Sequence, residues 1–442
     1  MKRTLTALCA ASLVIASCGG DDDEPDATDA PSATDAPTAT DAPPATDATD
    51  STDAPPATDA TDATLVPGGT AAVDVDAALA ADLAACADAP TGDPIKVGMA
   101  LDFGEVSGFA DIPGGNATSY LAELINCTGG VNGSPVEVEI RDIQGDPQVT
   151  ATATQELLDG GAHFLIGPPF ADFGQPVLQV TGGAVPVFFA ASTEPSLPNI
   201  DANSFLVSFD DTAQATAAAE WALDAGYTRA ITFSSPGPYF GYNPEVFTEV
   251  FTAGGGEIVT DQPYTPVEDV DFSAQVNEIA GLADGTEIVY SAMLAFQVTA
   301  LRGQLEGQGL DTLAYIGSDA FEATGILAEA NNEGIFHTTH AYAAPGGRIE
   351  RLLAGYEAAK GEPLESGTFA GLYADALLLG IQGIVDCGCT DPAGIGVAVA
   401  AIESFEGFTG QMGYAGTNGV PDKPVSIHQV VDGVDTLVAD WG

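Results

Sequence analysis

Positive charge is nearly missing from this chain. Its 442 residues include 10 Lys and Arg against 64 Asp and Glu, which gives a formal net charge of −54. Nucleic acids are bound mainly through Lys and Arg on their phosphates, so the composition argues against a nucleic-acid partner. The acid excess suits the exposed surface of a soluble protein, and a hydrophobic content of 45% is enough for a sizeable core.

Common catalytic motifs are also missing. The sequence contains no G-x-S-x-G, no Walker-type phosphate loop and no H-E-x-x-H. The HTTH run at 337–340 is a weak metal pattern, because on a strand this spacing puts the two rings on opposite faces. We therefore expect no catalytic residue, no cofactor and no metal, and an enzyme of the cell envelope is a less favoured alternative.

The N-terminus carries an export signal. Lys2 and Arg3 precede the apolar run TLTALCAASLVIAS, which is too short to be a stable membrane span with these flanks. The run ends in VIASC, which resembles a bacterial lipobox. The resemblance implies that residues 1–18 are a lipoprotein signal segment and that Cys18 is lipidated, which would anchor the protein on the extracytoplasmic face of the cell membrane. An ordinary secretion signal and a short membrane anchor, with Cys18 incidental, are the alternatives.

Residues 19–69 are of low complexity. TDAPSA, TDAPTA and similar units repeat with a period of six. Thr, Asp, Ala and Pro in this pattern offer no core, so we expect a disordered acidic tether.

Few cysteines remain after the signal segment. Cys86, Cys127, Cys387 and Cys389 are an even number in an exported chain, which favours disulfides. Of the three possible pairings, we favour Cys86 with Cys127 and Cys387 with Cys389. A metal site built from these four is less favoured, since no histidine or second close cysteine pair accompanies them.

Apolar strands and helices alternate through the rest of the chain. A short helix is expected within 70–93, and strands such as IKVGMAL and HFLIGP then alternate with helices. The helix in DPQVTATATQELLD should open with an Asp cap and a Pro at its first position. Other helices are expected in NATSYLAELIN (116–126), GQPVLQVTGGA (174–184) and NPEVFTEVFTAGGG (243–256). This rhythm restarts after residue 209, continues into long helices through 406 and ends in a hairpin over 425–441. The alternation predicts an α/β fold with parallel, doubly wound sheets in two lobes.

An ordered set of segments resembles a known family. IKVGMALDFGEVSG, the stretch from AELINCTGG to HFLIGP, VPVFFAASTEPSL, DFSAQV and YIGSDAF follow one another as in the leucine/branched-chain amino-acid-binding family of ABC-transporter substrate-binding proteins. The resemblance covers residue 94 to the end. It implies the type I periplasmic-binding fold, with two Rossmann-like doubly wound lobes joined by a three-strand hinge. Lobe 1 would comprise 94–209 and 343–410, and lobe 2 would comprise 210–342 and 423–442.

The same resemblance implies a function. The expected protein is an extracytoplasmic solute-binding lipoprotein that holds a small amino-acid-like ligand between its lobes and delivers it to an ABC permease. The first alternative is a sensing or scavenging lipoprotein of the same fold without a permease.

Two segments of lobe 1 are implied to hold the ligand carboxylate. The first is the loop 168–175 with Ala171 and Asp172, where relatives often carry Ser at the position of Ala171, so backbone amides would make the contact. Its alternative role is to cap the following helix through Asp172 or Gly174. The second is Ser192 and Thr193, whose hydroxyls suit such a contact and whose alternative role is a turn before Pro195.

In lobe 2, Asp319 is implied to pair with the ligand ammonium, or alternatively to cap a helix at 320–330. Phe240 is the aromatic residue favoured as a ligand contact. Met293 or Leu294 stands where relatives often have Tyr, which favours a larger or more apolar ligand than leucine. Other aromatic residues that could wall the cleft are Phe103, Phe109, Phe170, Phe173, Tyr239 and Phe321.

Overall fold

The computed structural model describes residues 72–86, 89–104, 106–321 and 332–441. The predicted signal segment with Cys18 and the predicted tether lie outside the described residues. So does most of the helix expected at 320–330.

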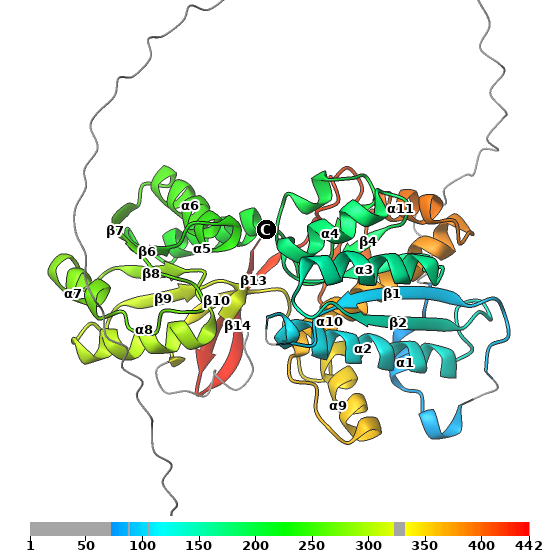
Figure 1. Cartoon of the computed structure of the whole chain (residues 1–442). Coiled ribbons are helices and arrows are strands. Elements are labelled where there is room, and N and C mark those ends of the chain that lie inside the picture. The colour runs from blue at the N-terminus through cyan, green and yellow to red at the C-terminus, as the bar shows by residue number, and fades with distance from the viewer. Residues whose placement is uncertain (1–71, 87–88, 105, 322–331, 442) are drawn as a thin grey trace, which may run out of the picture. The chain divides into compact units, whose positions relative to one another are not determined.

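Lobe 1 is built on a parallel sheet with the order β2-β1-β3-β4-β5 (Figure 1). Strands β1 and β3 are almost wholly buried, which explains why their sequences are continuous apolar runs. In the edge strand β2, one buried position is followed by a mixture of half-buried and exposed ones. The strand bounds are Ile95–Leu101 (β1), Val136–Asp142 (β2), Phe164–Gly167 (β3), Val187–Phe189 (β4) and Ser204–Leu206 (β5).

Six longer helices of lobe 1 are described, three from each of its two chain segments. Helix α3 starts as predicted, with the Asp146 carboxylate accepting the N–H groups of Gln148 and Val149 and with Pro147 at the first helical position. The expected N-terminal helix is shorter than predicted and forms only α1, Val75–Leu79, and a 3₁₀ turn, Leu83–Ala85. The six helices are Gly108–Cys127 (α2), Pro147–Asp159 (α3), Ala171–Thr181 (α4), Arg348–Lys360 (α9), Gly367–Cys387 (α10) and Pro392–Ala400 (α11).

Helix α10 forms the centre of the lobe 1 core. It packs against α2, and Gly114 of α2 lies so close to the Tyr373 ring that a Cβ there would come within 2.4 Å of it. Within the described residues, α10 is the one helix whose length and composition would suffice to cross a membrane. Because 89% of its apolar window is buried inside the protein, these features reflect its place in the core.

Lobe 2 is built on a mixed sheet with the order β14-β13-β10-β9-β8-β6-β7. The last two strands of the chain, β13 and β14, join it antiparallel, and the others run parallel. The bounds are Arg229–Ser234 (β6), Glu257–Pro263 (β7), Ile288–Ser291 (β8), Ala314–Gly317 (β9), Phe336–Thr339 (β10), Val425–Val431 (β13) and Val434–Trp441 (β14).

The two faces of this sheet have separate cores. One core includes Ile231 and Phe233 with side chains of α7 (Ser273–Leu282) and α8 (Ala295–Gly307). The other includes Ala230 with side chains of α5 (Asp211–Asp224) and α6 (Pro238–Ala253). Successive strand residues point to opposite faces, so a doubly wound sheet with helices on both sides follows.

The described chain passes between the two sheets three times. Residues 207–210 lead from β5 to α5, residues 340–347 lead from β10 to α9, and residues 413–424 lead into β13 from a small hairpin, Phe405–Glu406 (β11) with Gln411–Met412 (β12). Two crossings touch, since the rings of Phe209 and His340 stack with centroids 4.0 Å apart. This is the type I periplasmic-binding fold that the sequence predicted.

Both disulfides join cysteines that the sequence paired. Cys86 bonds to Cys127 and so ties the 3₁₀ turn at the start of the described chain to the end of α2. Cys387 bonds to Cys389 across the end of α10.

Candidate functional site

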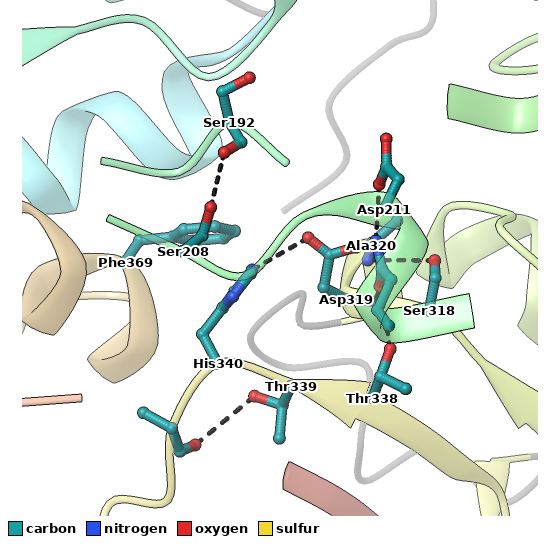
Figure 2. Close-up of polar contacts among 12 residues, drawn as sticks. Ser192, Ser208, Asp211, Ser318, Asp319, Ala320, Thr338, Thr339, His340 and Phe369 are labelled. Carbon is teal, nitrogen blue, oxygen red and sulfur yellow. Dashed lines mark hydrogen bonds and ion pairs between the residues drawn. The ribbon is translucent and has the colours of Figure 1, made fainter. Parts of the chain in front are cut away.

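Asp319 lies just beyond strand β9, buried among polar side chains (Figure 2). Its carboxylate accepts hydrogen bonds from Nε2 of His340 (3.0 Å) and from the hydroxyl of Tyr239 (2.5 Å). Its backbone N–H donates to Oε1 of Gln214 (3.2 Å). Asp319 itself opens a 3₁₀ turn that ends at Phe321. A carboxylate at the end of a parallel strand therefore gathers three partners that are distant in the sequence.

Its partners keep Asp319 ionised. Burial alone would raise the pKa of this carboxyl, but the hydrogen bonds from His340 and Tyr239, together with the polar contact of Gln214, outweigh burial and lower it. Burial lowers the pKa of His340, and the neighbouring carboxylate opposes this only in part. The pair is therefore an ionised carboxylate beside a neutral imidazole that donates its Nε2–H.

A second buried acid, Asp211, connects Asp319 to lobe 1. The Asp211 backbone N–H donates to the carbonyl of Thr193 (2.8 Å), and its carboxyl accepts from Nε2 of Gln214 (2.7 Å). Gln214 thus bridges the two acids. Burial raises the pKa of Asp211 well above its ordinary value, and the charge of Asp319 raises it further. The two acids together therefore carry about one negative charge.

Ser192 presents a hydroxyl without a partner. Its Oγ is buried and makes no hydrogen bond to any residue that the structure describes. Its carbonyl accepts the hydroxyl of Ser208 (2.5 Å), which holds the segment in place (Figure 2). A buried hydroxyl that lacks a partner costs free energy, so an unused hydrogen-bonding group here is informative.

The predicted loop 168–175 is mostly helix. Helix α4 begins at Ala171, its N-cap is Phe170, and no side chain caps it, so the alternative role, a cap by Asp172 or Gly174, is wrong. Ala171 and Asp172 instead supply N–H groups of the first turn, which have no partner within a helix. Within the described chain, no hydrogen bond joins these two residues to the group around Asp319.

The aromatic residues divide between core and surface. Helix α6 starts five residues earlier than predicted, which puts Tyr239 and Phe240 on its first turn. Tyr239 contacts Asp319, whereas the Phe240 ring packs edge-on against Tyr239 (5.2 Å) and Tyr264 (6.4 Å). Phe173 and Phe321 are buried in the cores.

A cluster of aromatic rings occurs in lobe 1. Phe109 is 45% exposed and lies against Phe170 (6.2 Å between centroids) and Phe369 of α10 (5.5 Å). Phe103, at the end of β1, is 46% exposed.

Five residues that contact the candidate site residues were not predicted from the sequence to do so: Asp211, Gln214, Ser208, His340 and Phe369. A pair of acids directly after a strand, at 210 and 211, was the one local signal for any of them.

A profile of proteins described as periplasmic binding protein matches residues 94–435. The chain belongs to this family. The curated Leu/Ile/Val-binding protein BraC3 of Rhizobium johnstonii is 26% identical to this periplasmic binding protein over 277 residues, which are 55% of this chain and 74% of that protein.

Solved structures share its fold. The leucine-binding protein LivK of Thermotoga maritima superimposes with a TM-score of 0.67 at 21% identity, over 79% of this chain and 99% of that one. A solute-binding protein of an ABC transporter from R. palustris, solved in complex with benzoate, gives a TM-score of 0.65 at 19% identity, over 78% of this chain and 96% of that one. At such identities the likeness establishes the fold.

Proposed function

We propose that this periplasmic binding protein is the solute-binding component of an ABC importer and binds a small amino-acid-like solute. The observation that carries the proposal is the buried, ionised carboxylate of Asp319. It shares one hydrogen-bonded group with Asp211 and Thr193, and Thr193 follows Ser192, whose hydroxyl has no partner among the residues that the structure describes.

The group around Asp319 suits an ammonium. A buried, ionised carboxylate forms a strong charge-assisted hydrogen bond with such a cation. Asp211 adds a second carboxyl that shares the hydrogen-bonded network through Gln214. An arriving positive charge would favour ionisation of both acids, which increases the attraction.

The ligand carboxylate requires donors without negative charge. The hydroxyl of Ser192 meets this requirement, since it can donate one hydrogen bond, and the hydroxyl of Thr193, which hydrogen-bonds to the Asp211 carboxyl, would have to turn to add a second. The first N–H groups of α4, at Ala171 and Asp172, would add the positive end of a helix. Together these groups would read the two ends of an α-amino acid.

Exposed aromatic surface makes aromatic acids a second candidate. Phe103, two residues beyond β1, and Phe109, on the first turn of α2, are each nearly half exposed. The R. palustris relative was solved with benzoate. Benzoate has no ammonium, however, so it would leave Asp319 without a cationic partner, which favours the amino acid.

A thermal-shift screen followed by calorimetry tests the proposal. The panel contains branched-chain and aromatic amino acids, their amides, and benzoates. Ligand at about 100 times its Kd should stabilise the chain by about 2.7 kcal/mol and raise Tm measurably. We expect α-amino acids to respond and benzoates not to. No response to any solute would refute solute binding, and turnover of the bound solute would favour the enzyme alternative.

The anchor and the permease are tested separately. We propose that Cys18 carries the lipid and that the acidic segment 19–69 spaces the protein from the membrane. Cys18→Ala should release the protein from the membrane fraction and abolish incorporation of labelled fatty acid. Uptake of the bound solute should fall when the protein is deleted; binding without any uptake defect would support the sensing or scavenging alternative.

A further inference from the structure

Three potential metal ligands meet on the lobe 2 sheet, apart from the Asp319 group. His337 of β10 pairs in register with His428 of β13, and Asp435 lies on the neighbouring strand β14. Nε2 of His337 lies 2.9 Å from Oδ1 of Asp435, and Nδ1 of His428 lies 2.7 Å from Oδ2. One ligand atom from each residue falls within 4.8 Å of the others.

The other nitrogen of His337 indicates which ligand atom is available. Nδ1 of His337 lies 3.2 Å from the backbone carbonyl oxygen of Thr338. A carbonyl oxygen only accepts, so Nδ1 carries the proton, and the neutral ring turns the lone pair of Nε2 toward the Asp435 carboxylate. Two lone pairs at 2.9 Å repel unless a cation lies between them. That cation is either a proton or a metal ion.

His428 is weakly fixed on its far side. Its ring is fully buried, and its Nε2 has no hydrogen-bond partner among the residues described here. The Tyr342 ring lies nearly perpendicular to it at 5.5 Å. Among the described residues, Asp435 therefore makes the one hydrogen bond to this imidazole. It does so at Nδ1, which is the atom that would bind the ion.

We propose that His337, His428 and Asp435 bind a divalent cation of the zinc type. Two imidazole nitrogens and one carboxylate oxygen match the ligand set of zinc sites that have three protein ligands and one open position. A hydrogen bond from the second nitrogen of a ligating histidine to a backbone carbonyl is the usual orienting contact, and His337 makes it to Thr338. The Asp435 side chain is 31% exposed, which leaves a route for the ion and for a water in the fourth position.

Binding requires an adjustment of the three side chains. Ligand atoms around a four-coordinate zinc ion are roughly 3.4 Å apart when each bond is about 2.1 Å. The separations of 2.9 and 2.7 Å, which run to the two different oxygens of Asp435, must open by roughly 0.5 to 0.7 Å, and the three ligand atoms, now within 4.8 Å of one another, must converge on the same spacing. Asp435 can supply this movement because it lies on the edge strand β14.

The ion would fasten the C-terminal hairpin to the sheet. Its ligands come from three adjacent strands, so binding would link β14 and β13 to β10. Thr338, which faces the opposite side of the sheet from His337, donates its hydroxyl to Gln214 in the Asp319 group. The metal site and the proposed solute site therefore lie on opposite faces, and this proposal does not depend on solute binding.

Zinc titration of the full chain, stripped with EDTA, tests the site. We expect one tight equivalent of Zn²⁺ by calorimetry and a rise in Tm on binding. Asp435→Asn and His337→Gln each remove a direct ligand. Each should lower the zinc affinity of this site by more than the 10- to 100-fold that loss of an outer orienting partner costs. His163→Gln is the matched control, because His163 accepts a hydrogen bond from the Lys96 backbone N–H in lobe 1; it should leave zinc binding unchanged.

Two further readouts separate specific binding from attraction to an acidic surface. Weak sites on a chain of net charge −54 would remain in all variants, whereas the tight equivalent should disappear in the two cluster variants. Co²⁺ at the site should give the intense visible absorption of four-coordinate cobalt. The proposal is overturned if the folded chain binds no zinc tightly, or if Asp435→Asn and His337→Gln bind zinc as tightly as the parent does. In either case a proton, and not a metal ion, would lie between Nε2 of His337 and Asp435.

Discussion

Each lobe has a buried acid near the carboxyl end of a parallel strand that can be compared, Asp111 in lobe 1 and Asp319 in lobe 2, and these two acids differ in charge. In lobe 1, Asp111 accepts from the Tyr373 hydroxyl, from Ser107 and from the Asp102 backbone N–H, none of which is basic. Burial therefore dominates and raises the pKa of Asp111 to about 7. In lobe 2, the hydrogen bonds from His340 and Tyr239, together with the polar contact of Gln214, lower the pKa of Asp319 although this residue is also buried.

The comparison shows that burial alone does not decide the charge of a carboxyl. The hydrogen-bond partners decide it, and of these two acids only Asp319 has a histidine as a partner. For this reason Asp319, and not Asp111, is suited to attract a cation, and the four predictions below test this difference.

The largest expected effect concerns Asp319 itself. Asp319→Asn should weaken binding of the amino acid selected in the screen by about 30-fold or more, since loss of one partner from a buried charge pair costs about 2–5 kcal/mol. Asp111→Asn is the matched control and should leave affinity within about threefold. Calorimetry measures both. Equal losses in the two variants would remove the distinction between the lobes.

The second prediction concerns pH. Folding raises the pKa of Asp111 from 3.8 to about 7, so the folded chain keeps a proton that the unfolded chain loses. The stability from this group is complete below pH 3.8 and is lost as the pH rises through 7. Relative to Asp111→Asn, the parent should lose roughly 2 kcal/mol between pH 5 and pH 7. Denaturant unfolding at several pH values measures this; a constant difference between the two proteins would contradict it.

The third prediction compares the two tyrosines. Tyr373→Phe removes a donor from buried Asp111 and should destabilise the chain by about 1–2 kcal/mol, because no basic group replaces it. It should also raise the pKa of Asp111 further. Tyr239→Phe should cost less, since His340 still donates to Asp319. Thermal unfolding of both variants tests the order, and a larger loss for Tyr239→Phe would reverse it.

The smallest expected effect concerns Ser192. Its hydroxyl has no partner in the described chain, so Ser192→Ala should leave stability unchanged or slightly higher while weakening solute binding by about 3- to 10-fold. Ser208→Ala is the counterpart, because it removes a hydrogen bond to the Ser192 carbonyl and should lower Tm. If Ser192→Ala loses stability and keeps affinity, the hydroxyl is structural.

Buried strands were the most predictable part of the fold. β1 spans the residues that the apolar run IKVGMAL indicated, and the capped start of α3 was confirmed. Both features depend on neighbours in the sequence, and local pattern is sufficient for such cases.

The starts of three helices were predicted too late: α2, α4 and α6. The early part of α2 contains residues that usually belong to loops, Pro113 and Gly114, whereas Pro238 stands at the first position of α6, where proline suits a helix start. Packing overrides these local preferences, and Gly114 is needed because Tyr373 lies against it. Contacts of that kind join residues far apart in the sequence and leave no local pattern.

The residues of the candidate site also fall into two sets, those that the sequence predicted and those that it did not. Asp319, Ser192 and Thr193 were proposed because their segments resemble a known family. His340 and Tyr239 were not assigned their contacts with Asp319, since a crossing segment and the first turn of α6 meet β9 only in the folded chain. The His337–His428–Asp435 group depends likewise on the pairing of β10 with β13, about 90 residues apart, so the expectation of no metal could not take it into account.

The order in which the chain is made has a consequence for the lobe 2 sheet. β13 covers the edge of β10, yet it follows β10 by about 90 residues in the chain. Until β13 has left the ribosome, β10 presents an unpaired strand edge, which is a template for aggregation. A nascent chain, or one truncated before β13, should therefore depend on chaperones much more than the folded protein does, and removal of β13 and β14 should lower its yield more than their size suggests.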